Sequence, residues 1–460
     1  MFRTALAVLV LTVGPMTESR AQPAADARLL EERVRDWFEP LVETRDFSGV
    51  IMVRHGDNLP AALTFGYADW VTGEPMRADA RFPTGSITKS LTAAMAHRLI
   101  DEGRLAPDTV VSRLVPELTG YDRVRISDIL GHTAGLPRDV PPGALGDSAS
   151  DTLVAWLANQ PAPDAGPHAY AYSNVGYGLL AVIIERAVNA RFETLLTTEF
   201  LIPLDLQRSR VVRQDGSTLA GVPTGYTAGP LPLDLRAPMA NTPALGASGL
   251  VAPMEDLLRL ADAVASRRID LFEPDGRMTG SWSVEQLSGE TIYTIQGSVP
   301  GYSAGISVLP ERDITIAYGT SLESYPNWEI RDVLHALALG QPVAPAAGRP
   351  ATDRLTSGHL EAVGTYSGSP FGPVALTQTE GGLDLVLTER DWRFYLTPTG
   401  IDAFNWRLFN TDMTLERDAA GRVTAITANQ AGLTGEGRGY RLERTDLPPL
   451  PTTGTETTEN

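Results

Sequence analysis

One lysine restricts this chain more than any other single feature of its sequence. Lys89 is the only lysine in 460 residues, and the other 37 of the 38 basic residues are arginine. It stands three residues after Ser86. Arginine keeps its proton at any useful pH, whereas burial can lower the pKa of a lysine until it acts as a base. The pair Ser86-x-x-Lys89 therefore predicts a nucleophile with its own base.

The residues around this pair carry the pattern of a helix. Apolar side chains recur at helical spacing and a glycine follows where the helix would stop: Ile87, Leu91, Ala94, Met95, Leu99 and Gly103. Ser86 is then in the first turn, where free N–H groups and the helix dipole stabilise developing negative charge. Ser86 and Lys89 share one face of this helix. An isolated S-x-x-K more often marks a capping serine and a solvated lysine, but the lone lysine and the motifs below favour catalysis.

Composition excludes several classes of function. The net charge of −18 argues against nucleic acid and anionic membrane surfaces as partners. The chain has no cysteine, so thiol catalysis and disulfides are excluded, and its six histidines show no metal-ligand spacing. We therefore expect no metal and no cofactor. With Ser86 as a nucleophile, the expected partner is a small-molecule or peptide substrate. The oligomeric state stays open.

The N-terminus has the pattern of a cleavable signal peptide over residues 1–21. A charged start, Met1-Phe-Arg3, precedes a short apolar run, and Ser19-Arg-Ala21 supplies small residues for cleavage. The apolar run is shorter than the roughly 20 residues of a membrane span. The alternative is an N-terminal core helix. We expect a periplasmic or secreted protein without stable membrane insertion.

Residues 22–340 read as one α/β (α+β) domain. Strands are expected at Ser48–Arg54 and Ala62–Tyr67, and again from Thr291 to Tyr318, with the helices between. Strands at both ends of a domain suggest one antiparallel sheet that is closed by the N- and C-terminal segments and faced by helices. A helical subdomain lies between them.

The remaining chain divides into three parts. Residues 341–354 are rich in Pro, Ala and Gly and read as a linker. Residues 355–446 alternate apolar and polar residues with frequent turns, which predicts an all-β barrel or sandwich module. Residues 447–460 are rich in Pro and Thr and are expected to be a disordered tail.

A second motif supplies further polar groups. Acyl transfer by a serine needs a base, a proton donor to the leaving group and an oxyanion hole. Tyr172 and Asn174 stand just before an apolar-periodic segment and can project into a cleft together. Alone, they would more often be ordinary loop and cap residues.

Several motifs in order resemble the class C beta-lactamase-related serine hydrolases, a family that includes penicillin-binding proteins, D-aminopeptidases and esterases. The motifs, within about residues 30–340, are Ser86-Ile-Thr-Lys89, Gly131-His-Thr-Ala-Gly-Leu-Pro137, Tyr170-Ala-Tyr-Ser-Asn174, Ser248-Gly-Leu-Val-Ala-Pro-Met-Glu-Asp-Leu257 and Gly297-Ser-Val-Pro-Gly-Tyr302. The resemblance implies a beta-lactamase/transpeptidase-like fold and a small lipocalin-like C-terminal domain.

The same resemblance implies roles for individual residues. Ser86 would be acylated, Lys89 would be its base, and Tyr172 would relay protons. Asn174 would hold Lys89 and bind the substrate amide. His132, in the Gly131–Pro137 motif, is expected to be a structural loop histidine.

The third motif of the family departs from its usual form. Where relatives have Lys-Thr-Gly or His-x-Gly, this chain has Ile295-Gln296-Gly297. Gly297 still permits close approach of the backbone, so the amides of Ser86 and Ser298 could form the oxyanion hole. Isoleucine carries neither charge nor a donor, so we expect esterase-type activity to exceed beta-lactam turnover.

Two alternatives remain. Gly301-Tyr-Ser-Ala-Gly305 matches the nucleophile elbow of α/β-hydrolases, but Ser303 opens an apolar strand, not a strand–turn–helix. The other alternative is a catalytically silent binding protein on a penicillin-recognising fold, which Ile295 motivates.

Overall fold

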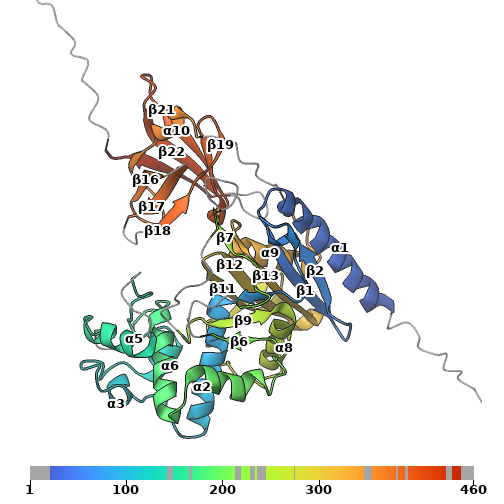
Figure 1. The fold of residues 1–460 in the computed structure, drawn as a ribbon, viewed down its shortest axis with the longest axis vertical. Helices are drawn as coiled ribbons and strands as arrows, with labels where there is room; N and C mark the ends of the chain where they lie inside the picture. Colours follow the sequence, from blue (N-terminus) through green and yellow to red (C-terminus); the bar gives the residue numbers. More distant parts are fainter. Residues whose placement is uncertain are drawn as a thin grey trace, which may run out of the picture.

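The computed structural model describes residues 21–141, 149–164, 168–212, 219–227, 234–235, 245–273, 275–346, 355–379, 382–388, 392–430 and 438–446. Nearly all of the expected signal peptide and the whole C-terminal tail lie outside these residues. The described chain forms a domain within residues 21–346, which we call the hydrolase-type domain after the sequence resemblance, and a C-terminal β domain within residues 355–446 (Figure 1).

The hydrolase-type domain is built on a six-stranded antiparallel sheet of order β10-β11-β12-β13-β1-β2. Its strands are β10 (Ser283–Leu287), β11 (Glu290–Val299), β12 (Tyr302–Leu309), β13 (Ile314–Thr320), β1 (Gly49–His55) and β2 (Ala61–Phe65). The N-terminal strand β1 pairs with β13, with Gly49 opposite Thr320. The two ends of the domain therefore close one sheet, as the sequence predicted.

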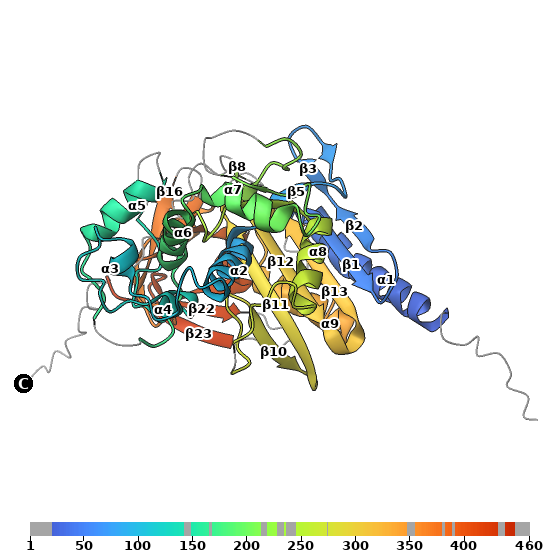
Figure 2. The ribbon, with the colours of Figure 1, turned by 90° about the horizontal axis from the view of Figure 1, so that it is seen from below.

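Side chains of the central strands alternate between two apolar cores. Ile51 and Val53 of β1 belong to one core, and Val50 and Met52 belong to the other. Helices α1 (Ala21–Glu43) and α9 (Asn327–Ala338) cover the first face, and α8 (Met254–Ala265), α2 (Thr88–Asp101) and α6 (Asn174–Val188) lie on the second (Figures 1 and 2). A sheet that is buried on both faces holds its edges and loops in fixed positions.

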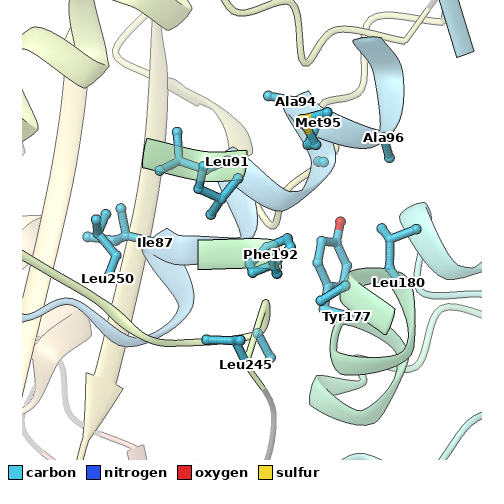
Figure 3. Packing of buried hydrophobic residues seen from close by; sticks show 14 of the residues in the cluster. Ile87, Leu91, Ala94, Met95, Ala96, Tyr177, Leu180, Phe192, Leu245 and Leu250 are labelled. Carbon is cyan, nitrogen blue, oxygen red and sulfur yellow. The ribbon is translucent and has the colours of Figure 1, made fainter. Parts of the chain in front are cut away.

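The second face carries the predicted helical subdomain. Besides α2 and α6 it contains α3 (Val111–Leu114), α4 (Ile126–Leu130), α5 (Ala149–Ala158), α7 (Phe192–Leu196) and the π-helical turn Thr197–Leu201. Ile87 and Leu91 pack near Leu250, and Tyr177 and Leu180 of α6 lie across from α2 (Figure 3). This packing fixes the start of α2 between the sheet and α6.

Short strands tie the loops of this domain together. They form three small sheets: β5 (Arg81–Pro83), β9 (Leu250–Pro253) and β6 (Arg210–Val211); β14 (Leu322–Glu323), β7 (Tyr226–Thr227) and β8 (Asp234–Leu235); and β3 (Tyr67–Asp69) with β4 (Glu74–Pro75). The β5–β9 pair leads directly into the segment that carries Ser86.

The C-terminal domain is a nine-stranded antiparallel sheet that curls into a nearly closed barrel around its own apolar core. After the short helix α10 (Ser357–Leu360), its strands are β15 (Gly364–Ser367), β16 (Val374–Thr379), β17 (Gly382–Leu387), β18 (Trp392–Tyr395), β19 (Thr397–Gly400), β20 (Ala403–Trp406), β21 (Thr411–Arg417), β22 (Val423–Gln430) and β23 (Arg438–Arg444). The two edge strands, β18 and β19, are separated in sequence by Leu396 alone, which brings the edges of the sheet together.

The first residues of the expected linker pack on the hydrolase-type domain. Trp37 Nε1 donates to the carbonyl of Ala344 at 2.9 Å, and Arg33 donates to the carbonyl of Gln341. Residues 347–354 lie outside the described part of the chain. The division of the chain at 341–354 stays a prediction.

Candidate active site

Ser86 lies in a 3-10 turn, η1 (Gly85–Ile87), that runs directly into α2. The turn is tied to β9 on both sides, because Thr84 Oγ1 donates to the carbonyl of Leu250 at 2.9 Å and Leu250 N donates to Thr88 Oγ1 at 3.0 Å. Gly85 has a φ of +53°, which a glycine adopts without strain. Ser86 is thus held at the start of a helix, as the sequence predicted.

Lys89 is completely buried one turn further on. Its Nζ lies 3.0 Å from Ser86 Oγ, 2.7 Å from Asn174 Oδ1 and 2.9 Å from the carbonyl oxygen of Ala247. A neutral amine has two N–H donors and one lone pair. It can donate to Asn174 and Ala247 and still accept the Ser86 proton. This arrangement suits a general base.

Tyr172 and Asn174 reach Ser86 and Lys89 from the start of α6. The Tyr172 hydroxyl lies 2.6 Å from Ser86 Oγ. Asn174 Nδ2 donates to Asp139 Oδ1 at 2.5 Å, which leaves Asn174 Oδ1 directed at Lys89. The structure therefore brings together all four polar side chains that the sequence singled out.

Burial shifts the pKa values of the ionisable groups. Desolvation holds the pKa of Lys89 well below its ordinary value, while the charge of Asp139 opposes this shift and that of Arg138 adds to it. Desolvation also raises the pKa of Tyr172, against hydrogen bonds from Ser86 and Ser281. A neutral lysine and a protonated tyrosine on either side of Ser86 are the forms in which one can accept a proton and the other can donate it.

The backbone of β11 lies against η1. A Cβ added to Gly297 would be 2.0 Å from the Thr84 carbonyl oxygen and 2.6 Å from Ser86 N, and one added to Gly85 would be 2.7 Å from Ser298 N. Only glycine permits this approach. The amides of Ser86 and Ser298 are therefore close neighbours at the edge of β11 that β10 leaves free, since β10 pairs only with residues 290–294.

His132 stacks on Tyr172, with ring centroids 4.6 Å apart. Its Nδ1 accepts from the amide of Ser173 at 3.1 Å, so Nε2 carries the proton toward Ser281 Oγ, also 3.1 Å away. Burial, with Lys89 and Arg138 nearby, lowers the pKa of His132 to about 4. The neutral ring contacts Tyr172 and not Ser86.

Three neighbours of the cluster were missed in the sequence. Asp139 orients Asn174, Ser281 contacts Tyr172 and His132, and the carbonyl of Ala247 accepts from Lys89. None belongs to a motif of spaced residues, and a backbone carbonyl carries no residue-type signal. The conformation of Ser281, at φ +67°, is equally invisible in the sequence.

The structure gives no support to the competing nucleophile. Ser303 lies inside β12, is 3% exposed, and its Oγ lies 3.0 Å from Ser298 Oγ. A nucleophile elbow needs a strand–turn–helix, and here a strand continues to Leu309.

Among the described residues, no group of three or more His, Asp or Glu side chains could hold a metal ion. In the same residues, no helix is both long and apolar enough to cross a membrane.

A family model described as Beta-lactamase matches residues 34–340, about two thirds of the sequence. The chain belongs to the beta-lactamase family. Among curated relatives, it is 30% identical to penicillin-binding protein 4* of Bacillus subtilis over 184 residues, covering 38% of this chain and 40% of that protein. It is 26% identical to esterase EstB of Burkholderia gladioli over 293 residues, covering 54% of this chain and 74% of that protein.

One solved structure is similar in fold to this beta-lactamase family member over both of its domains. The octameric penicillin-binding protein homologue from Pyrococcus abyssi covers 91% of this chain and 99% of its own, with a TM-score of 0.58 and 22% identity. In sequence, the chain spans about half the length of the first curated relatives, between 40% and 54%. At 22% identity, the similarity to the Pyrococcus abyssi structure shows a shared fold alone.

The third motif of this beta-lactamase family member is apolar, as the sequence indicated. Ile295 is 2% exposed and packs in the core that contains α2 and α6. Gln296 faces the other way, and its Nε2 donates to Tyr318 Oη at 2.7 Å and to the carbonyl of Asn327 at 2.6 Å. No side chain of this motif supplies a charge to the site.

Proposed function

We propose that this chain is a secreted serine hydrolase that forms a covalent acyl-enzyme on Ser86. The observation that carries the proposal is the contact of Ser86 Oγ with both Lys89 Nζ, at 3.0 Å, and Tyr172 Oη, at 2.6 Å. A buried amine and a phenol on either side of one hydroxyl fit a nucleophile, its base and its proton relay. Membership of the beta-lactamase family supports the same chemistry.

In the acylation step, Lys89 takes the proton of Ser86 while Oγ attacks the substrate carbonyl carbon. The carbonyl oxygen gains negative charge, and the amides of Ser86 and Ser298 donate to it. Asn174 holds Lys89 and offers its amide to the substrate. As the bond to the leaving group breaks, Tyr172 gives its proton to the departing oxygen and recovers one from Lys89.

In the deacylation step, water attacks the carbonyl carbon of the acylated Ser86. Lys89 and Tyr172 accept the proton of that water and pass it to Ser86 Oγ as the bond to the acyl group breaks. The carboxylic acid product leaves, and the hydroxyl, amine and phenol return to their starting states.

The substrate class that fits best is a neutral ester with a good leaving group. Relatives with Lys or His at the third motif have a side chain there that can bind a substrate carboxylate, whereas Ile295 is apolar and buried. An activated ester needs neither a carboxylate partner nor strong protonation of its leaving group. Peptides and amides are the next candidates, and beta-lactams the least favoured.

The burial of Ile295 also favours one competing function, a binding protein that captures a substrate without turning it over. In either case we place the protein in the periplasm or outside the cell, because residues 1–21 have the pattern of a signal peptide.

The test compares kcat/KM for an activated acetate or butyrate ester with that for a chromogenic cephalosporin. We expect the ester to be the better substrate and Ser86→Ala to abolish its turnover, while Ser303→Ala, the matched control, retains it. Ile295→His should shift the ratio toward the cephalosporin. A wild type that hydrolyses both equally well contradicts the proposed substrate class, and one that hydrolyses neither favours the binding protein.

A further inference from the structure

The C-terminal β domain contacts the first turn of α9 through a buried polar pair. Asn410 Nδ2 donates to Glu329 Oε2 at 2.5 Å, and Tyr325 Oη donates to Glu329 Oε1 at 2.7 Å. Asn410 is 2% exposed and Glu329 is 6% exposed. A carboxylate buried this far depends on these donors, because unpaired burial of a charge is costly.

A second contact between the domains also reaches the segment around the start of α9. Arg407 forms an ion pair with Asp46 at 2.8 Å, and both side chains are almost fully buried. Ser324 Oγ in turn donates to the backbone carbonyl of Asp46 at 3.3 Å. Both contacts therefore converge on residues 324–329, the segment that leads into α9.

The first residue of α9 holds the strand beside Ser86. Asn327 Nδ2 donates to Ser298 Oγ at 3.1 Å and to the Gly297 carbonyl at 3.3 Å. Its own backbone carbonyl accepts from Gln296 Nε2 at 2.6 Å. Three consecutive residues of β11 are thus fixed to one asparagine.

We propose that the C-terminal β domain positions the oxyanion-binding amide of Ser298, through Asn410, Glu329 and Asn327. The proposal rests on the proposed function, in which that amide binds the oxyanion. Asn327, Glu329 and Asn410 are positioning residues, since none of them contacts Ser86. Gln296, in the divergent third motif, gains a role as part of this support.

The expected effect falls on kcat. An oxyanion donor acts only when it lies within hydrogen-bonding distance of the charge that develops in the transition state, and small displacements weaken it. Loosening α9 should therefore reduce transition-state stabilisation and leave ground-state binding nearly unchanged.

The test uses the full-length chain and a reversed hydrogen bond. Asn410→Asp places a carboxylate against Glu329 and removes the donor. In the double variant Asn410→Asp/Glu329→Gln, the glutamine can donate to the new aspartate while its oxygen still accepts from Tyr325. Glu329→Gln alone is the control, because the glutamine oxygen can accept from the Asn410 amide while the glutamine amide donates to the Tyr325 hydroxyl.

We would titrate active sites with a fluorophosphonate and measure kcat per site and KM with an activated ester. We would also measure the inhibition constant of a boronic acid, a transition-state mimic. Asn410→Asp is expected to lower kcat about tenfold and weaken the boronic acid by a similar factor, with KM within about twofold. The double variant should recover most of both losses.

An Asn410→Asp variant with wild-type kcat per site, or a loss that the double variant does not recover, overturns the domain link. A change in KM alone also overturns it. If Asn410→Asp does not fold, Asn327→Ala takes its place, and unchanged kcat in that variant overturns the proposal. If the fluorophosphonate labels no site in the wild type, the proposed function fails, and that outcome is distinct from failure of the link.

Discussion

At the scale of single residues, the proposed acylation of Ser86 depends most on Lys89 as its base. Its amine is buried, and its neighbours are a hydroxyl, an amide oxygen and a backbone carbonyl. Desolvation has the largest effect on its pKa and lowers it, while the charge of Asp139 raises the pKa and that of Arg138 lowers it. The uniqueness of this lysine in the sequence fits a position where no arginine can serve.

We predict that Lys89→Arg is as damaging as Lys89→Ala. A guanidinium cannot become a neutral base at working pH, and loss of general-base help lowers the rate by about 10²–10⁴-fold. Steady-state kinetics with an activated ester measure this. Arg77→Lys, at a solvent-exposed ion pair with Asp79, serves as the control. An arginine variant with more than half of the wild-type activity would show that only a positive charge is needed.

The pH dependence of stability should also report on Lys89. Its folded pKa lies below the ordinary value, so between the two values the unfolded chain binds more protons than the folded one. The free energy of unfolding therefore rises with pH in that window, by up to about 1.4 kcal/mol per pH unit. We expect wild type to gain stability relative to Lys89→Met between pH 7 and pH 10, measured by urea unfolding. Parallel profiles for the two proteins would contradict a depressed pKa.

At the scale of elements, the close contact of β11 with η1 creates the pair of amides. Gly297 and Gly85 permit it, because a Cβ at either position would collide with the backbone of the other segment. The contact depends on β11 extending past β10, which pairs only with the first half of the strand.

We predict that Gly297→Ala disables catalysis without unfolding the protein. Its Cβ would lie 2.0 Å from the Thr84 carbonyl oxygen, so β11 must move away from η1. Loss of one oxyanion donor lowers kcat by about 10²–10³-fold. Gly400→Ala, where the nearest atom would be the Ala403 Cβ at 3.4 Å, is the matched control. Retention of kcat in Gly297→Ala, with unchanged circular dichroism, would remove Ser298 from the proposed mechanism.

The sequence predicted the elements that have a strong local signal. The helix after Ser86 and five strands of the central sheet (β1, β2, β11, β12 and β13) follow from apolar periodicity and turn residues. Strand β10 was not predicted, because Ser283–Leu287 is largely polar and exposed and forms a strand only by pairing with β11. Asp139 and Ser281 were missed for a similar reason: loops far apart in sequence carry them to the site, and only tertiary structure shows it.

At the scale of the whole molecule, two domains with separate cores are joined by buried polar contacts. Within the described part of the chain, the barrel core contains no residue of the hydrolase-type domain. The interface includes the buried Arg407–Asp46 pair and the Asn410–Glu329 hydrogen bond. Separate cores favour independent folding of the two domains, and the buried contacts between them are the ones on which the proposed positioning of Ser298 depends.

We predict that a chain ending at Arg349 still folds, because its two cores are complete without residues 355–460. In that chain, water would replace Arg407 and Asn410 as the partners of Asp46 and Glu329. Calorimetry should show a single cooperative transition, and kcat should be lower than in the full chain. An insoluble product, or one without a cooperative transition, would count against independent folding.

The most direct test of the proposed chemistry is the site of acylation. Full-length protein would be treated with a fluorophosphonate, digested, and mapped by mass spectrometry, with Ser86→Ala and Ser303→Ala treated in parallel. We expect one adduct, on the peptide that contains Ser86, which is absent from Ser86→Ala and unchanged in Ser303→Ala. An adduct on Ser303, or labelling that persists in Ser86→Ala, would contradict Ser86 as the nucleophile.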